Sequence, residues 1–366
     1  MAHLTLLSLI FLVSLIVSST SKPLKEQPAL FIFGDSYLDA GNNNYIATSP
    51  LNQANFPPYG ETHFGLPTGR FSDGRIIPDF LSEHFGLPSV APYLQPGFRQ
   101  YRYGVNFASG GAGALVGTYK GYVIDLKSQL NNFKNVAKVL KKENGEYATK
   151  GILSRAVFLL GVGANDYFSQ ISTNSSLLNS YGLPQYVGMV VGNLTQVIKE
   201  IYVTGGRKFA VMNLQALESI PLVRLLDEQK NTTEVSKTLK LLGSLHNRAL
   251  SDKLVRLHAE LGGFEYSLLD LNGLMGQLIR NPSKYGLKNG TWACCGGGKY
   301  RGIYSCGGTR PVKEYDLCDD PRDYVFWDSS HLTDKAYGVI AANMLKKRAR
   351  ANHGGSLGLP QLFLKT

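Results

Sequence analysis

The sequence has few cysteines and no motif typical of a metal site. Its 366 residues include 4 cysteines, all within one stretch: Cys294, Cys295, Cys306 and Cys318. No C-x-x-C pair and no histidine at ligand spacing accompanies them, which argues against zinc. An even number of clustered cysteines in an exported chain indicates two disulfides. A vicinal Cys294–Cys295 bridge would strain the backbone, and the other two connectivities both stay open.

Long apolar runs are also lacking, apart from one at the N-terminus. Residues 4–17 are nearly all apolar and small residues follow at 18–21. Such a run is too short to cross a bilayer comfortably, so residues 1–21 are expected to be a signal peptide. We therefore expect a secreted protein with no stable membrane insertion. No Ser/Gly-rich linker or charge block interrupts residues 22–366, which predicts a single domain.

The basic residues form no patch of the kind that binds nucleic acid. There are 38 lysines and arginines against 27 aspartates and glutamates, a formal net charge of +11. They are spread along the chain, and the longest cluster, at residues 346–350, is typical of a helix C-terminus. We expect no nucleic-acid partner, and only loose attraction to anionic polymers such as acidic wall polysaccharides.

Four N-x-S/T sequons agree with export, at Asn174, Asn193, Asn231 and Asn289. Asn281 is excluded because Pro282 follows it. The four remaining asparagines are the expected glycosylation sites.

Short β-rich runs alternate with longer helical patterns, which predicts a parallel sheet flanked by helices. The expected strands cover residues 30–33, 103–107, 156–161, 208–213 and 266–271. Apolar residues recur at helical spacing over residues 184–204, 233–261 and 333–350, which predicts three long helices. Open parallel sheets bind ligands beyond the carboxyl ends of their strands, so chemistry is expected just after the strands.

A serine follows the first expected strand, in the run Phe33-Gly34-Asp35-Ser36. At that position Ser36 can expose its hydroxyl to a cleft and point its own backbone N–H toward an oxyanion. Gly-Asp-Ser is also common in turns that end a strand, so the tripeptide alone is a weak signal.

Asp328 and His331 stand three residues apart near the other end of the sequence. Within one loop, the carboxylate can accept a hydrogen bond from the imidazole and stabilise the imidazolium formed when His331 takes the serine proton. The alternative is an N-cap role for Asp328 and a surface position for His331.

Two further segments can stabilise a developing anion. Residues 104–113 are glycine-rich and follow the second strand, so their backbone N–H groups can turn toward the site. Asn165 follows the third strand and offers an amide donor. The glycine spacing does not fit a dinucleotide fingerprint and no G-K-[ST] follows, so nucleotide binding is not expected.

Taken in this order along the chain, the motifs resemble the plant GDSL esterases/lipases of the SGNH hydrolase superfamily. The resemblance covers essentially the whole chain after the first 21 residues. It is carried by the runs FGDS, DAGNN, PPYG, GRFSDGR, NFASGG, GANDY, ACCG and FWDSSH. The likeness implies a flavodoxin-like three-layer α/β/α fold with a five-stranded parallel sheet, and ester hydrolysis without metal or cofactor.

The same likeness implies roles for particular residues. By the family pattern Ser36 is the nucleophile, His331 is the base and Asp328 orients that base. The backbone N–H of Ser36, a glycine best matched by Gly111 and the amide of Asn165 would form the oxyanion hole.

Two features of that assignment stay open. Gly110 and Gly113 lie within one alignment slip of Gly111. The chain also departs from the family at residues 215–219, where relatives have Pro-Pro-Leu-Gly-Cys, and at Leu332, where proline is usual. Neither departure touches a triad position, but both can reshape the substrate pocket.

Three functions are consistent with these residues. The first is a secreted carboxylic-ester hydrolase of the apoplast or cell wall, which acts on a small-molecule or lipid ester through an acyl-enzyme. The second is an acyltransferase that passes the acyl group to an alcohol with the same triad. The third is a non-catalytic wall-binding glycoprotein, against which the intact motif residues argue. A glycosylated enzyme of this size is expected to be a monomer.

Overall fold

The central element of the fold is a five-stranded parallel sheet with the order β2-β1-β3-β4-β5. The computed structural model describes residues 28–172, 180–346 and 355–365. The strands are β1 (Leu30–Gly34), β2 (Gly104–Asn106), β3 (Val157–Gly161), β4 (Lys208–Met212) and β5 (Glu265–Leu269). All five expected strands are confirmed, with ends that differ from the predicted ones by at most two residues.

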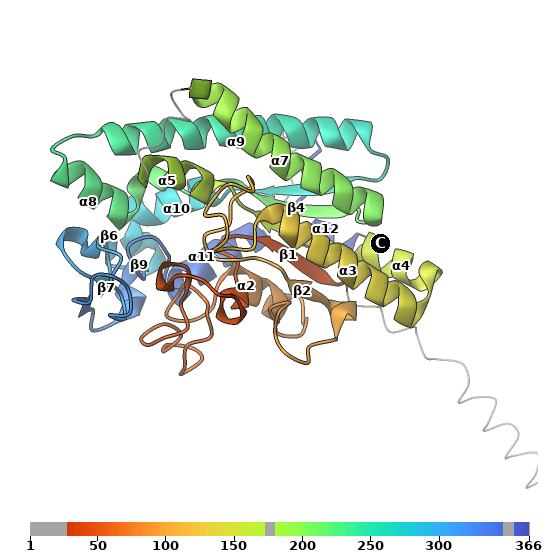
Figure 1. Cartoon of the computed structure of the whole chain (residues 1–366), viewed down its shortest axis with the longest axis horizontal. Coiled ribbons are helices and arrows are strands. Elements are labelled where there is room, and N and C mark those ends of the chain that lie inside the picture. Colours follow the sequence, from red (N-terminus) through yellow and green to blue (C-terminus); the bar gives the residue numbers. More distant parts are fainter. Residues whose placement is uncertain (1–27, 173–179, 347–354, 366) are drawn as a thin grey trace, which may run out of the picture.

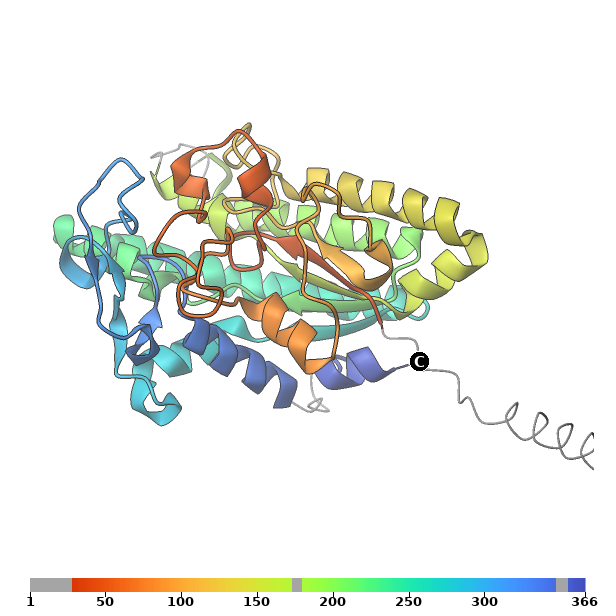
Figure 2. The same ribbon diagram turned by 90° about the horizontal axis from the view of Figure 1, so that it is seen from below.

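Helices cover both faces of this sheet and form three layers (Figures 1 and 2). One face carries α3 (Leu126–Asn144), α4 (Glu146–Arg155), α7 (Leu183–Thr204) and α9 (Glu234–Glu260). The other carries α2 (Ile77–His84), α10 (Leu271–Arg280), α11 (Asp334–Lys346) and α12 (Leu359–Leu364). Strands covered on both sides bury nearly every residue, which explains continuous apolar runs such as LFIFG in β1 and VFLLG in β3. The predicted α/β/α architecture is confirmed.

The long helices follow the predicted periodicity. In α7 the apolar stripe is buried from Val187 to Ile201, and in α9 it is buried at most positions, with Leu245 and Leu261 only partly covered. Residues 347–350 of the last expected helix, the expected signal peptide and Asn174 lie outside the described residues. Within the described part of the chain, no helix is long and apolar enough to span a membrane.

A smaller region near the C-terminal end carries the cysteines. Strand β6 (Asn289–Ala293) pairs with β9 (Tyr324–Phe326), and β7 (Cys295–Gly296) pairs with β8 (Asp316–Leu317). Disulfides join Cys294 to Cys318 and Cys295 to Cys306. The two predicted disulfides are confirmed, and one of the two connectivities left open by the sequence is the observed one.

Buried carboxylates hold the loops at the carboxyl edge of the sheet. Asp39 accepts hydrogen bonds from the N–H groups of Gly41 and Gly110, at 2.7 and 2.9 Å. Asp166 accepts from the N–H of Ala114, at 2.8 Å, and from the hydroxyl of Thr118, at 2.6 Å. Asp39 therefore ties the segment after β1 to the loop after the neighbouring β2, and Asp166 ties the segment after β3 to that same loop.

Four buried carboxylates, Asp39 and Asp166 among them, predict that the stability of the protein depends on pH. Burial raises the pKa of Asp35 to about 7, and the pKa values of Asp39, Asp73 and Asp166 to about 6, from an ordinary value of 3.8. The folded chain therefore binds more protons than the unfolded chain between about pH 4 and 7, so the free energy of unfolding rises as pH falls through that window. One group opposes this trend, because burial lowers the pKa of His246 to about 3. With four groups against one, we expect a higher Tm at about pH 5.5 than at about pH 8, measured by thermal unfolding.

The variant Asp35→Asn shows how much of this pH dependence of stability comes from Asp35. Asp35→Asn keeps an acceptor for the N–H of Tyr37, which Asp35 Oδ1 accepts at 3.1 Å, and removes the carboxyl with the highest of the four pKa values. Its Tm should change less between about pH 6 and 8 than that of the parent protein. A parent Tm that is flat or rises toward pH 8 would contradict the prediction.

Candidate active site

Ser36 follows β1, and close packing fixes the end of that strand. A β-carbon on Gly34 would lie 2.4 Å from the carbonyl oxygen of Gly161 on the neighbouring β3, so only glycine allows the two strands to pair there. The side chain of Gln129 on α3 bonds both the N–H and the C=O of Gly34, at 2.9 Å each. Gly34, two residues before the serine, is thus held by both the sheet and a helix.

A short loop after β9 carries Asp328 and His331. It is closed by a β-bridge between Phe326 and Leu332. Inside the loop, Asp328 Oδ1 accepts the N–H groups of Ser330 and His331, both at 2.8 Å. The carboxylate that meets the imidazole therefore also shapes the loop that presents it. Asp328 does not cap the next helix.

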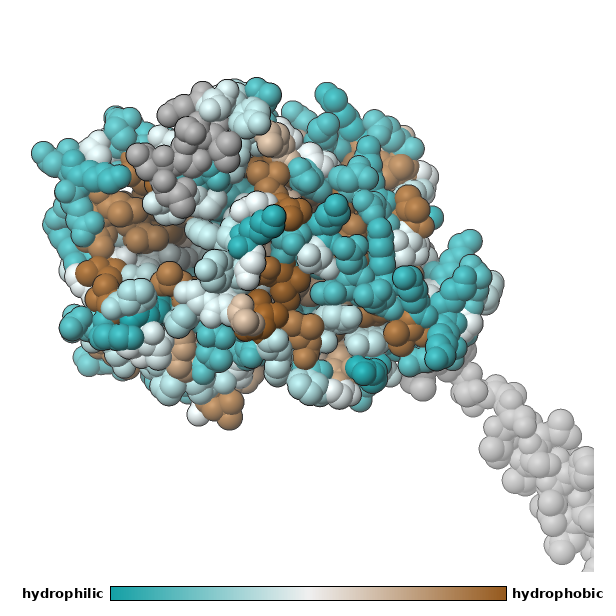
Figure 3. Space-filling model, viewed as in Figure 1, coloured by the Kyte–Doolittle hydropathy of each residue, from teal (hydrophilic) through white to brown (hydrophobic). Residues whose placement is uncertain are grey.

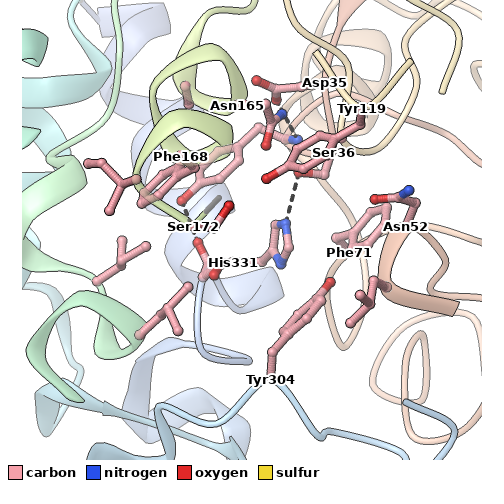
Figure 4. Close-up of a pocket in the computed structure, with 18 of the residues that line it drawn as sticks. Asp35, Ser36, Asn52, Phe71, Tyr119, Asn165, Phe168, Ser172, Tyr304 and His331 are labelled. Atoms are coloured by element: carbon pink, nitrogen blue, oxygen red, sulfur yellow. Dashed lines mark hydrogen bonds between the residues drawn. The ribbon is translucent and has the colours of Figure 1, made fainter. Parts of the chain in front are cut away.

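The structure brings these two residues to Ser36, and Figure 4 shows the bond between His331 and the serine. His331 Nε2 lies 2.8 Å from Ser36 Oγ, and His331 Nδ1 lies 2.8 and 2.9 Å from the two carboxylate oxygens of Asp328. The exposed fractions are 9% for Ser36, 5% for His331 and 0% for Asp328. A serine, an imidazole and a fully buried carboxylate thus form one hydrogen-bonded chain at the edge of the sheet.

Asp328 is ionised in spite of its burial. Burial raises the pKa of this carboxyl, but three neighbours outweigh it and hold the pKa well below its usual range: His331, the guanidinium of Arg310 and the hydroxyl of Tyr59. The Tyr59 hydroxyl donates to Asp328 Oδ2 at 2.6 Å. The Asp328 carboxylate therefore stays charged at neutral and mildly acidic pH, where it can stabilise an imidazolium.

Aromatic rings enclose His331. The ring of Phe71 lies 4.7 Å from the imidazole, centroid to centroid, and those of Tyr37 and Tyr304 lie 5.7 and 6.2 Å away. The hydroxyl of Tyr37 also donates to the carbonyl of Ser330 at 2.8 Å. This bond ties the segment after β1 to the loop after β9.

A cavity of about 800 Å³ opens beside the serine. Its walls come from the loops after β1 and β2, from α5 (Ala164–Ser172), from α8 (Pro221–Gln229) and from the start of α9. Most of the wall is apolar, and its apolar side chains are Leu51, Phe71, Phe168, Ile171, Ile220, Leu222, Leu226 and Val235. Figure 3 shows the hollow on the face of the molecule, with hydrophobic side chains around it. The volume is that of a typical small-molecule site.

The glycines after β2 differ in their access to this cavity. Gly111 lines it, and Gly110 and Gly113 do not. The N–H of Gly110 donates to Asp39, so it is already used. Gly111 has a φ of +84°, and a β-carbon there would lie 2.8 Å from Asn52 Oδ1, so this position requires glycine.

Asn165, near the start of α5, also lines the cavity. Its Nδ2 donates to the carbonyl of Ala112 at 3.0 Å, which fixes the amide and leaves its second hydrogen for another acceptor. Figure 4 shows the side chain on the same side of the cavity as Ser36. Ser36, Gly111 and Asn165, the residues expected to form the oxyanion hole, therefore line the same cavity.

The other predicted positions are distributed as follows. Asn193 on α7 and Asn231 after α8 are exposed, and Asn289 in β6 is partly exposed. Of the two departures from the family pattern, Gln215 lines the cavity, whereas Leu332 is fully buried and does not line it. Among the described residues, no three His, Cys, Asp or Glu side chains are grouped to hold a metal ion.

Three residues around the site escaped the sequence analysis. Gln129 fixes Gly34, and Tyr59 and Arg310 lie behind Asp328. Tyr59 stands in the PPYG run, which carried the resemblance, but no spacing rule indicates contact with a residue 269 positions away. Arg310 belongs to no recognisable pattern, so the sequence held no signal for it.

Comparison with known proteins agrees with this geometry. The model of the family described as GDSL-like Lipase/Acylhydrolase matches residues 30–344. GDSL esterase/lipase 5 of Arabidopsis thaliana is 52% identical over 86% of this chain and 81% of its own length. GDSL esterase/lipase 2 of the same plant is 51% identical over 86% and 85%, and a GDSL lipase of Tanacetum cinerariifolium is 43% identical over 85% and 82%.

The match extends from β1, which precedes Ser36, to α11, which follows His331. It therefore spans the whole sheet and both ends of the hydrogen-bonded chain. This protein belongs to the GDSL lipase/acylhydrolase family and is a serine ester hydrolase.

Proposed function

We propose that this protein is a secreted carboxylic-ester hydrolase that works through an acyl-enzyme on Ser36. The observation that carries the proposal is the unbroken chain from Ser36 Oγ through His331 to Asp328, at distances of 2.8 and 2.8 Å, on the wall of a largely apolar cavity. Serine, base and orienting carboxylate in this relation are the requirements for nucleophilic attack on an ester.

In the proposed reaction, Ser36 Oγ attacks the ester carbonyl carbon while His331 Nε2 takes its proton. Asp328 stabilises the imidazolium that results. His331 then gives the proton to the departing alcohol, and the acyl group remains on Ser36. A water molecule attacks the acyl-enzyme in the second half, with His331 again as base, which releases the acid and restores the serine.

The negative charge on the carbonyl oxygen requires donors. In the proposal these are the backbone N–H groups of Ser36 and Gly111 and the amide of Asn165. Gly111 is favoured over its neighbours because it lines the cavity, whereas the N–H of Gly110 is held by Asp39. Loss of one such donor typically lowers kcat by about 10²–10³.

Export, glycosylation and partners belong to the same proposal. The chain is proposed to be a monomer of the apoplast or cell wall, glycosylated at the four sequons, with loose attraction to anionic wall polymers through its net charge of +11. The exposure of Asn193 and Asn231 supports their modification.

The first test is labelling with a fluorophosphonate, which reacts only with an activated serine. We expect the probe on Ser36, and loss of labelling in Ser36→Ala and His331→Ala. Hydrolysis of a short-chain aryl ester should fall by about 10³ or more in Ser36→Ala, because the acyl-enzyme cannot form.

The control for this test is Ser172→Ala, which removes another serine from the wall of the same cavity. That variant should be labelled as fast as the parent protein. Comparable hydrolysis by a folded Ser36→Ala protein, or a probe found on a different serine, would refute the assignment.

The apolar cavity predicts a preference for longer acyl chains. Each methylene buried contributes up to about 0.8 kcal/mol, so kcat/KM for an octanoyl ester should exceed that for an acetyl ester by at least about 10-fold. Leu226→Trp, which fills part of the wall formed by α8, should lower the value for octanoyl and leave that for acetyl nearly unchanged. Equal values for the two esters in the parent protein would show that the cavity does not bind the acyl group.

Acyl transfer uses the same residues and differs only in what attacks the acyl-enzyme. The size of the cavity, about 800 Å³, leaves room for an alcohol beside a short acyl group. Product analysis with a saturating alcohol separates the two functions: an ester product in excess of the free acid would identify a transferase.

A further inference from the structure

The cation of Arg310 is completely buried, with 0% of the residue exposed. Its guanidinium lies 3.8 Å from the ring centroid of Tyr304 and 5.0 Å from that of Phe56. Nη2 donates to the carbonyl of Gln53 and to the hydroxyl of Tyr304, at 2.9 and 3.0 Å. A cation removed from water in this way is costly unless a negative group balances it.

The negative group that balances Arg310 is Asp328, and the side chain of Tyr59 lies between them. Arg310 Nη1 lies 2.9 Å from the hydroxyl of Tyr59, and that hydroxyl lies 2.6 Å from Asp328 Oδ2. Arginine has no acceptor, so Arg310 must donate to Tyr59. The single proton of Tyr59 is then directed to the carboxylate, and the direction of both bonds follows without any choice of tautomer.

We propose that Arg310 and Tyr59 are positioning residues of the active site, which hold the Asp328 carboxylate in place and adjust the basicity of His331 through it. The proposal rests on the proposed function, since it extends the chain from Ser36 to a fifth residue. Aligned hydrogen bonds polarise one another, so Arg310 strengthens the bond from Tyr59 to Asp328. Its positive charge also opposes the protonation of His331.

The position of Arg310 depends on the disulfide-bearing region. Its Nη1 donates to the carbonyl of Cys306 at 2.9 Å, and Cys306 is bonded to Cys295. Figure 4 shows Tyr304, from the same segment, reaching toward His331. The cystine region therefore supplies the cation that stands behind the carboxylate.

Few other groups near the carboxylate carry charge at neutral pH. Burial raises the pKa values of the neighbouring tyrosines, which stay neutral: Tyr37, Tyr59, Tyr304 and Tyr337. Burial raises the pKa of Asp35, beside Ser36, to about 7, and none of the variants below changes this residue. Asp328 and Arg310 are thus the charged pair that the variants below perturb.

The test compares Tyr59→Phe, Arg310→Met and the double variant by kcat, KM, pH profile and rate of fluorophosphonate labelling. We expect Tyr59→Phe to lower kcat and the labelling rate by about 10-fold, with KM within about two-fold, because neither residue lines the cavity. In both variants the acidic limb of the kcat/KM profile should move to higher pH by at least about 0.5 unit. The reason is that the positive charge of Arg310, or its link to the carboxylate through Tyr59, no longer opposes the imidazolium of His331.

A double-mutant cycle separates this role from a purely structural one. If Arg310 acts through Tyr59, Arg310→Met should have a much smaller effect on kcat in the Tyr59→Phe background than alone. Arg301→Met is the matched control, because Arg301 lies in the same segment and bonds the carbonyl of Ala293 instead. That control should keep kcat and the pH profile of the parent protein.

The outcomes are distinguishable. Unchanged kcat and an unmoved acidic limb in Tyr59→Phe, or fully additive effects in the cycle, would overturn the proposal. Because Tyr59→Phe removes only a hydroxyl, it remains decisive if Arg310→Met does not fold. Absence of labelling on Ser36 in the parent protein would instead refute the proposed function itself.

Discussion

The parallel order of the central sheet is the constraint on which the rest of the structure depends. All five strands point the same way, so the segments that follow them emerge at one edge. Ser36, Gly111 and Asn165 come from three different segments and meet there because β1, β2 and β3 are neighbours. Backbone N–H groups exposed at such an edge need acceptors. Asp39 and Asp166 provide them, which keeps the loops in one arrangement.

The loop after β9, which forms the second part of the site, is built differently from the sheet edge. The sheet edge presents Ser36, Gly111 and Asn165, whereas His331 stands on a loop that is closed by a β-bridge and enclosed by aromatic rings. Tyr37 joins the two parts through the carbonyl of Ser330. The proposed activity requires both parts to be held within about 0.5 Å, and each part has its own supports.

Much of this arrangement could be predicted from the sequence, because the signals involved are local. The strands were recognisable from buried apolar runs, whereas Ser36, Asp328 and His331 stand in motifs that are weak one by one and were assigned through the resemblance to a known family. The disulfide pairing could not be derived, since two connectivities satisfy the same spacing. Arg310 could not be found from the sequence, because its partners are two backbone carbonyl groups and two tyrosine hydroxyls, and no sequence pattern marks these contacts. Choosing among Gly110, Gly111 and Gly113 likewise required knowing that the N–H of Gly110 already donates to Asp39.

The serine and its base are 295 residues apart in sequence. During synthesis the chain emerges from its N-terminus, so Ser36 is made long before His331. If these residues act as proposed, a nascent chain has no activated serine until the region after β9 has docked on the finished sheet. In the proposed mechanism, ester cleavage therefore cannot begin before the end of the chain has folded, and a chain truncated before residue 331 would lack the base.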